Sequence, residues 1–271
     1  MICFPNAKIN IGLNIISKRT DGFHNLETVF YPIQLKDALE IVPTRPHFQT
    51  TLHPSGLVIE SAPEDNLVLK AYQLFGQSYT TQPLDIYLHK TIPHGAGLGG
   101  GSADAAFMLK LLSTYHEQEV SVEDLETMAS SIGADCSFFI KNKPVFAEGI
   151  GNIFTPIDLS LKGFFIVIIK PDVFVSTKEA YAMASPRKPE RSIKELVQRP
   201  IEEWKSLIVN DFERSIFALH PIIGEIKEEL YKQGAVFAQM SGSGSSVFGL
   251  FRKKPDIKTA QENFVWIGEL K

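Results

Sequence analysis

The sequence has little of several features that mark specialised classes of protein. Only two of its 271 residues are cysteines, Cys3 and Cys136, which argues against a disulfide scaffold and favours free thiols in a reducing compartment. No apolar run approaches the roughly 20 residues that a membrane-spanning helix needs. The first residues lack the basic and apolar segments of a secretory signal, so we expect a cytoplasmic protein.

An excess of positive charge is also absent, because the formal net charge is −4. A protein that binds a nucleic acid duplex normally carries a basic stripe, so we expect no nucleic acid partner. The hydrophobic content of 44% and charged content of 21% are typical of globular proteins. We expect two domains, 1–151 and 152–271, a small-molecule partner, no membrane contact, and a monomer or weak homodimer.

Two common catalytic patterns are missing as well. No cysteine and histidine residues have the spacing of a zinc site, and Gly242-Ser243-Gly244 is too short for the Gly-x-Ser-x-Gly elbow of serine hydrolases. The sequence therefore disfavours both metal hydrolases and serine hydrolases.

What the sequence does contain is a glycine-rich stretch at 93–103, with five glycines in the seven positions 95–101. The pattern predicts a strand over 84–92 before it and a helix over 104–116 after it. Glycines leave backbone N–H groups uncovered, and the start of a helix adds unpaired N–H groups and the positive end of a dipole. The stretch therefore predicts an anion site, most often one for phosphate.

Two known phosphate motifs can be compared with this stretch. A P-loop fails, because Gly101 stands where the motif requires lysine. The spacing Gly95-x-Gly97-x-x-Gly100 fits a dinucleotide fingerprint, with acidic residues downstream at 117 and 119. From the loop alone, a dinucleotide-dependent oxidoreductase therefore remains an alternative.

The N-terminal segment alternates in hydrophobicity over 8–15 and predicts a half-buried strand. Lys8 and Asn10 lie on its polar face, which the periodicity alone favours as solvated. A turn over 18–25 presents Phe23 and His24 before a second strand over 26–30. Such a turn is either a clamp for a nucleobase or an ordinary hairpin.

Further along, the pattern predicts short strands over 33–59, interrupted at four positions, and two capped helices. The interrupting residues are Pro43, Pro46, Pro54 and Gly56. The first helix follows Asn66, and the second begins at a capping box over 121–124 and ends at Gly133. Asp135 lies just beyond the second helix, before an apolar run, and is either a turn residue or a partly desolvated functional carboxylate.

The second half predicts a strand at 164–169, helical segments at 177–183, 192–197, 201–218 and 222–233, strands at 235–240 and 246–251, a helix at 256–263 and a strand at 264–267. This β-α-β-β-α-β order indicates an α+β domain with an antiparallel sheet. Between its middle strands lies the serine and glycine run 241–246, either a flexible hairpin or a second set of backbone donors for a phosphorylated ligand.

Three stretches together resemble the GHMP kinases of small metabolites: 5–10, 93–103 and 241–245. Their order and spacing agree with the family. The segments 19–24, 64–67, 132–135 and 146–151 narrow the resemblance to the branch that phosphorylates a cytidine-diphosphate sugar alcohol on the non-mevalonate route to isoprenoids. Another acceptor within the family remains an alternative.

The resemblance implies an α+β GHMP kinase fold, with an N-terminal domain like ribosomal protein S5 and a ferredoxin-like C-terminal domain. It also implies ATP and Mg²⁺. Asp135 would be the general base, with Lys8 beside it to orient the hydroxyl and offset phosphoryl charge. Residues assigned to ATP by the resemblance are Asn66, Pro93, His94, Gly95, Ala96, Gly97, Leu98, Gly99, Gly100, Gly101, Ser102 and Ala103, and Ser102 is also a candidate Mg²⁺ ligand.

The substrate residues implied by the resemblance are Asn10, Phe23, His24, Tyr181, Gly242, Ser243 and Gly244. His24 would read the edge of the cytosine, while Phe23 and Tyr181 would stack on its two faces. The chain departs from the family at Cys136-Ser137, where Val-Pro is usual, and in the serines of its third motif. These departures remove no charged catalytic group.

Overall fold

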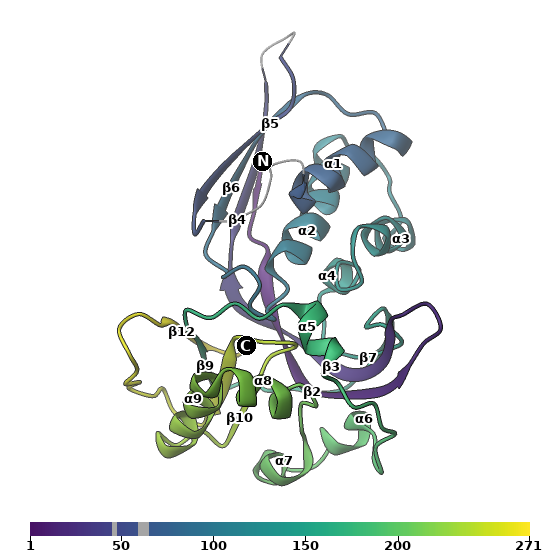
Figure 1. The fold of residues 1–271 in the computed structure, drawn as a ribbon. Helices are drawn as coiled ribbons and strands as arrows, with labels where there is room; N and C mark the ends of the chain where they lie inside the picture. The colour runs from purple at the N-terminus through teal and green to yellow at the C-terminus, as the bar shows by residue number, and fades with distance from the viewer. Residues whose placement is uncertain (45–47, 59–64) are drawn as a thin grey trace. The chain divides into compact units, whose positions relative to one another are not determined.

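The structure is a computed structural model that describes residues 1–44, 48–58 and 65–271 (Figure 1). The chain forms two compact units, each built from several separate segments. Unit 1 contains Met1–Ala7, Leu35–His94 and Gly99–Lys143, and unit 2 contains Lys8–Gln34, Gly95–Leu98 and Pro144–Lys271. The expected domain boundary at 151 stays a prediction, because the units interleave along the chain and follow a different division.

Unit 1 contains a four-stranded sheet with the order β1-β4-β6-β5. Its strands are β1 (Ile2–Cys3), β4 (Ala38–Pro43), β5 (Thr51–Gly56) and β6 (Leu84–Lys90), and its helices are α1 (Leu67–Ser78), α2 (Gly100–Tyr115), α3 (Val122–Ile132) and α4 (Phe138–Lys141). The predicted caps are confirmed. The side chain of Asn66 accepts a hydrogen bond from the N–H of Val68, and the hydroxyl of Ser121 caps α3 by accepting from the N–H of Asp124 while donating to the Asp124 carboxylate.

One predicted strand break in this unit is wrong. Pro54 lies inside β5, which is an edge strand paired in parallel with β6. An edge strand leaves one row of backbone groups unpaired, so the missing N–H of proline costs no ladder hydrogen bond there. Pro46 and the end of the expected strand at 59 lie outside the described residues.

Unit 2 contains two further four-stranded sheets, ordered β2-β3-β7-β8 and β10-β11-β9-β12. The first consists of β2 (Asn6–Lys18), β3 (His24–Lys36), β7 (Val145–Glu148) and β8 (Ile153–Pro156); β2 begins and β3 ends in unit 1. The second consists of β9 (Phe165–Lys170), β10 (Phe237–Met240), β11 (Val247–Phe251) and β12 (Phe264–Glu269). Its neighbouring strands are all antiparallel, in the ferredoxin-like order.

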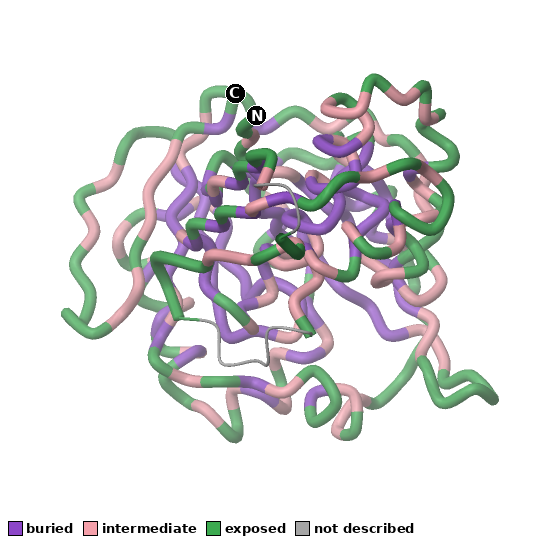
Figure 2. Tube along the Cα trace, turned by 90° about the horizontal axis from the view of Figure 1, so that it is seen from above, coloured by how far each residue is buried: buried purple, intermediate pink, exposed green. Residues whose placement is uncertain are grey.

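The helices of unit 2 are α5 (Thr177–Ala182), α6 (Ile193–Leu196), α7 (Ile201–Leu207), α8 (Glu213–Leu219) and α9 (Pro221–Lys232). Its hydrophobic core joins residues of the second sheet, such as Val167, to Leu13 and Ile15 of β2. Strand β2 is therefore packed on both sides and is buried from Asn6 to Ile15; Figure 2 shows the burial of the described residues along the chain.

Two helix predictions in the second half are corrected. The expected helix over 201–218 is two helices, α7 and α8, because the segment between them extends along β2 through the bridge Leu13–Asn210. The segment 256–263 forms no helix. The side-chain amide of Gln233 bonds both backbone groups of Lys258, which removes those groups from helical hydrogen bonding. Among the described residues, no helix has the length and apolar character to cross a membrane.

Candidate active site

Lys8 lies on β2, and its side chain is buried at 3% exposure. Its ammonium donates to Asn10 Oδ1 at 2.6 Å and to the carbonyl of Gly97 at 3.4 Å, and lies 4.6 Å from the ring centre of Phe30. The expectation of a solvated strand face is therefore wrong for Lys8 and Asn10, because β2 is covered on both faces. A buried ammonium group that hydrogen-bonds with a glycine loop is in a position to bind an anion.

The glycine loop has an alternating backbone. Gly95, Gly97 and Gly99 have φ of 60°, 73° and 70°, in the left-handed region, while Ala96 and Leu98 do not. Such alternation turns successive N–H groups toward one side and forms a concave anion site. Within the described chain, the N–H groups of residues 95–99 donate to no protein acceptor. The side chains of Ala96 and Leu98 are buried, so these residues offer only backbone to a ligand.

The helix after the loop starts earlier than the sequence predicts. Helix α2 begins at Gly100 instead of 104, with Gly99 as its N-cap and no side-chain cap. Gly100, Gly101, Ser102 and Ala103 therefore form its first turn, where N–H groups have no intrahelical partner. Glycine is a weak helix former, which is why the pattern places the boundary too late.

The third motif lies directly on the loop segment Gly95–Leu98 of the same unit. The hydroxyl of Ser241 donates to the carbonyl of Gly97 at 2.9 Å and accepts from the N–H of Asn10 at 3.1 Å. A Cβ at Gly97 would lie 1.9 Å from the carbonyl oxygen of Ser241. Only glycine allows this approach, so the three sequence motifs meet at one hydroxyl and one glycine.

In unit 1, Asp135 is half-buried in the turn between α3 and α4. Its neighbour Cys136 is fully buried, and Cys136 and the partly buried Cys3 are both free thiols. Burial raises the pKa of the Cys136 thiol to about 11, against a hydrogen bond with Ser102, and the charge of Asp135 adds to the rise. Cys136 is therefore an inert thiol that contacts the start of α2.

The residues expected to bind a base lie around the start of β3. The rings of His24 and Tyr181 are stacked, with centres 5.1 Å apart and planes at 19°, and Tyr181 meets Phe212 edge-on. Burial, followed by the charge of Lys18, lowers the pKa of His24 and favours its neutral ring. Phe23 is 59% exposed. The structure thus brings His24 and Tyr181 together within unit 2, although they are far apart in sequence.

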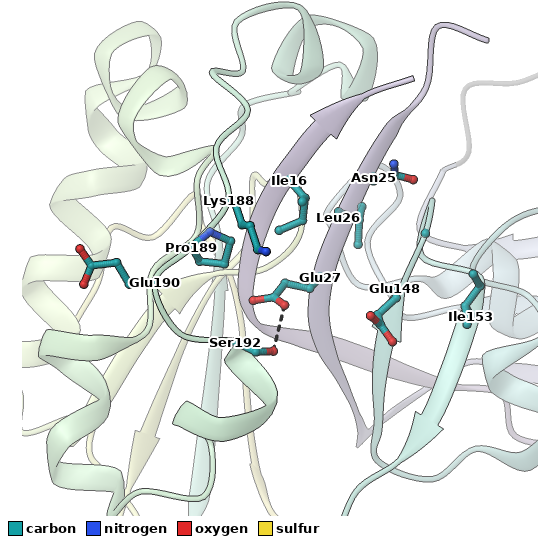
Figure 3. Close-up of a pocket in the computed structure, with 11 residues that line it drawn as sticks. Ile16, Asn25, Leu26, Glu27, Glu148, Ile153, Lys188, Pro189, Glu190 and Ser192 are labelled. Carbon is teal, nitrogen blue, oxygen red and sulfur yellow. Dashed lines mark hydrogen bonds between the residues drawn. The ribbon is translucent and has the colours of Figure 1, made fainter. Parts of the chain in front are cut away.

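A cavity of about 540 Å³ has Asn25, the residue that follows His24, in its lining (Figure 3). It is lined by Ile16, Asn25, Leu26, Glu27, Glu148, Gly149, Ile153, Lys188, Pro189, Glu190 and Ser192. The buried carboxylate of Glu27 accepts hydrogen bonds from the side chains of Asn14 and Ser192 and from the N–H of Ile193. Glu27 therefore holds the lining segment in place, and the volume is sufficient for a nucleoside.

Sequence reasoning misses a buried ion cluster in unit 1. Lys90, the last residue of β6, donates to the carboxyl groups of Asp37 and, at 2.6 Å, of Asp104 on α2. Asp37 also accepts from the N–H groups of Thr91 and Ile92, which lead into the glycine loop. The available signal is the alternation of β6, where Lys90 continues the buried face of Leu84, Ile86 and Leu88.

The donor set limits which metals this chain can hold. Within the described ranges, no three histidine, cysteine, aspartate or glutamate side chains cluster to bind an ion. Magnesium in kinases is held mainly by nucleotide phosphates and water, with one or two protein oxygens. Ser102 offers such an oxygen in the first turn of α2, so the residues present fit a nucleotide-bound magnesium and not a dedicated metal centre.

Comparisons with known proteins identify the family of this chain. Residues 66–143 match the N-terminal domain model of the GHMP kinases, and residues 192–265 match their C-terminal model. The chain is 60% identical to a 4-diphosphocytidyl-2-C-methyl-D-erythritol kinase of Bacteroides fragilis, over 97% of this chain and 96% of that protein. It is 62% identical to the kinase of that name from Bacteroides thetaiotaomicron, covering 93% and 92%.

Solved structures support the same conclusion. A crystal structure of a 4-(cytidine 5′-diphospho)-2C-methyl-D-erythritol kinase matches with a TM-score of 0.74 and 32% identity, over 92% of this chain and 90% of that one. The mevalonate kinase of Methanococcus jannaschii has a TM-score of 0.72 at 14% identity, covering 100% and 98%, and shows a shared fold. The chain belongs to the GHMP kinase family, in the group of the 4-diphosphocytidyl-2-C-methyl-D-erythritol kinases.

Proposed function

We propose that this protein transfers the γ-phosphoryl group of ATP to the 2-hydroxyl of 4-diphosphocytidyl-2-C-methyl-D-erythritol. The observation that carries the proposal is the buried ammonium of Lys8, which bonds both Asn10 and the glycine-loop carbonyl of Gly97. It sets an ammonium group against a loop whose N–H groups suit phosphate. The identity to kinases of this name, which extends over nearly the whole chain, supports the choice of acceptor.

Phosphoryl transfer depends mainly on positioning and electrostatic stabilisation. Asp135 takes the proton of the acceptor hydroxyl as its oxygen attacks the γ-phosphorus, and the bond to the bridging oxygen of ADP breaks. Lys8 offsets negative charge on the transferred group, and Asn10 orients the acceptor. The loop 93–103 holds the phosphates through its N–H groups, with Asn66 completing the nucleotide site.

Magnesium enters this proposal only through Ser102. Its hydroxyl would take one coordination position, while nucleotide phosphates and water take the others. When bound, the ion neutralises phosphate charge. In this structure the Ser102 hydroxyl hydrogen-bonds with the thiol of Cys136. Because a thiol is a weak hydrogen-bonding group, this contact holds the hydroxyl only weakly.

The cytidine end is assigned to the turn before β3 and to α5. Neutral His24 has both a donor and an acceptor nitrogen, which suits the mixed edge of cytosine. Phe23 and Tyr181 supply aromatic faces, and the cavity after His24 has room for the nucleoside. Gly242, Ser243 and Gly244 are assigned to the substrate diphosphate, with the N–H groups of Gly242 and Ser243 as the donors, because the N–H of Gly244 donates to the carbonyl of Ser241 within the loop.

A coupled assay of ADP release tests the proposal. Purified protein with ATP and magnesium should turn over 4-diphosphocytidyl-2-C-methyl-D-erythritol and leave mevalonate, homoserine and galactose untouched. Turnover of one of the other acceptors alone would make this a different GHMP kinase. NAD(P)H binding with no ATP hydrolysis or transfer would revive the oxidoreductase alternative.

A further inference from the structure

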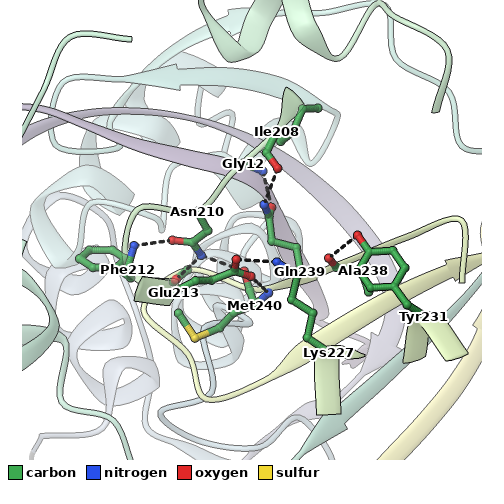
Figure 4. Close-up of polar contacts among 11 residues, drawn as sticks. Gly12, Ile208, Asn210, Phe212, Glu213, Lys227, Tyr231, Ala238, Gln239 and Met240 are labelled. Atoms are coloured by element: carbon green, nitrogen blue, oxygen red, sulfur yellow. Dashed lines mark hydrogen bonds and ion pairs between the residues drawn. The ribbon is translucent and has the colours of Figure 1, made fainter. Parts of the chain in front are cut away.

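Asn210 lies outside the three family motifs, yet its buried side chain holds the third one. Its Nδ2 donates to the carbonyls of Met240 and Gly242, both at 2.8 Å, while its Oδ1 accepts from the N–H of Phe212 at 3.0 Å (Figure 4). The side chain is 3% exposed, and each of its polar atoms is used. An amide with this set of bonds has a single orientation.

The main chain around Asn210 is attached to β2, the strand that carries Lys8 and Asn10. Leu13 donates to the carbonyl of Val209 and accepts from the N–H of Asp211, and the Asp211 carboxylate accepts from the N–H of Ile15. One strand thus sets the position of Asn210, and Asn210 sets the position of the third motif.

The loop over 241–246 needs contacts from outside because its own composition does not restrict its backbone conformation. Residues 241–246 are serines and glycines, and Gly242 and Gly244 have φ of 57° and 93°. These conformations are accessible to glycine but not enforced by it. Ordering such a segment carries a high entropic cost, which contacts from outside the loop must offset.

The bond to the carbonyl of Gly242 also directs an N–H group. In a trans peptide, the C=O of one residue and the N–H of the next point in opposite directions. Because Asn210 draws the carbonyl of Gly242 toward itself, the N–H of Ser243 points away from Asn210. Among the described residues, this N–H donates to no protein acceptor, whereas the N–H of Ser241 donates to Ser246.

We propose that Asn210 is a positioning residue that aims the N–H of Ser243 at an anionic oxygen of the cytidine-diphosphate substrate, an inference that rests on the proposed function. The nucleotide loop depends on a different contact, the hydroxyl of Ser241 between Asn10 and Gly97. Loss of the Asn210 side-chain amide therefore weakens binding of the cytidine-diphosphate substrate more than binding of ATP.

Two variants and a matched control test this inference. Asn210→Asp keeps the shape and the acceptor for Phe212 but removes both donors, and Asn210→Ser removes them without adding charge. Tyr231→Phe removes a hydrogen bond to the carbonyl of Ala238, on the same strand β10 but outside the loop. Either Asn210 variant should raise KM for the cytidine substrate about tenfold, with KM for ATP within about twofold of wild type.

The control should lower Tm without changing either KM. Equal increases in both KM values, or an unchanged acceptor KM, would overturn the assignment. Hydrogen exchange gives a readout independent of turnover, since the amides of 241–244 should exchange faster in the Asn210 variants and not in Tyr231→Phe. If wild type shows no turnover of the cytidine substrate, the proposed function fails, and titration with cytidine 5′-diphosphate together with exchange still decides the role of Asn210.

Discussion

At the scale of single residues, environment and chemistry together decide which side chains can act. Lys8 and Asn10 are polar residues on a strand face, and only their burial against Gly97 and Phe30 distinguishes them from a solvated face. Asp135 is half-buried beside an inert thiol. Its role as a base stays a prediction that substitution can test.

Asp135→Asn should abolish most turnover while retaining the fold and the binding of a non-hydrolysable ATP analogue. The amide keeps the shape but cannot accept the hydroxyl proton, a contribution worth about 10²- to 10⁴-fold. Steady-state assays and calorimetric titration measure the two properties. The control is Asp124→Asn, an exposed capping aspartate on α3, which should keep wild-type activity. Full activity of Asp135→Asn would refute the base assignment.

Tyr181→Leu should raise KM for the cytidine substrate and leave KM for ATP unchanged. A stacked base is worth about 1–3 kcal/mol by substitution, which is roughly 5- to 150-fold in affinity. Unit 1 contains a matched pair, His53 and Tyr87, stacked with ring centres 4.7 Å apart, so Tyr87→Leu is the control. If the two variants behave alike, Tyr181 has only a packing role.

At the scale of elements, the glycine loop is followed directly along the chain by α2, and phosphate binding by these residues stays a prediction. The loop supplies alternating left-handed glycines, and the helix contributes its first turn from Gly100 onward. The third motif packs on this segment so closely that Gly97 has no room for a side chain. The loop geometry thus depends on a partner loop more than 140 residues later in the chain, as the contact between Gly97 and Ser241 shows.

Gly97→Ala should lose ATP binding and much of its thermal stability, because the added methyl would collide with a backbone carbonyl. Gly163→Ala is the matched control. Its φ of 85° is equally unfavourable for alanine, but a Cβ there meets nothing within 4 Å. The difference between the two variants in Tm and in ATP affinity isolates the collision from backbone strain. Similar losses in both would show that strain alone explains the effect.

At the scale of the whole chain, stability depends on what each unit buries. Unit 1 buries the cluster of Lys90, Asp37 and Asp104, in which Asp104 Oδ1 has no partner among the described residues. Burial raises the pKa of Asp104 to about 8, with Lys90 opposing the rise and Asp37 adding to it. The folded protein therefore holds a proton on Asp104 that the unfolded chain, with a pKa near 3.8, releases.

This difference makes stability fall as pH rises. Between about pH 4 and about pH 8 the folded state binds more protons than the unfolded state, so the contribution of Asp104 is complete below pH 4 and lost as pH passes 8. Denaturant unfolding from pH 5 to 9 should show this fall in wild type. Asp104→Asn cannot titrate and should have a shallower profile, while Asp124→Asn should follow wild type. Parallel profiles for wild type and Asp104→Asn would contradict the expectation.

The sequence by itself determined the local elements and the family. Capping residues placed α1 and α3, hydrophobic alternation placed β2 and β6, and the three motifs at 5–10, 93–103 and 241–245 identified a GHMP kinase. These features are readable because they depend on residues a few positions apart. Where local signals were weak, as at 256–263, a distant side chain decided the conformation.

Tertiary structure alone decided which polar groups are buried and what they contact. The bonds of Lys8 to the loop, the stack of His24 on Tyr181 and the clamp of Asn210 on the third motif join residues distant in sequence. No periodicity encodes such pairings, because they arise when strands and loops meet in space. The motifs therefore identified the kinase family, and the packing within each unit determined which polar atoms are buried and which atoms they contact.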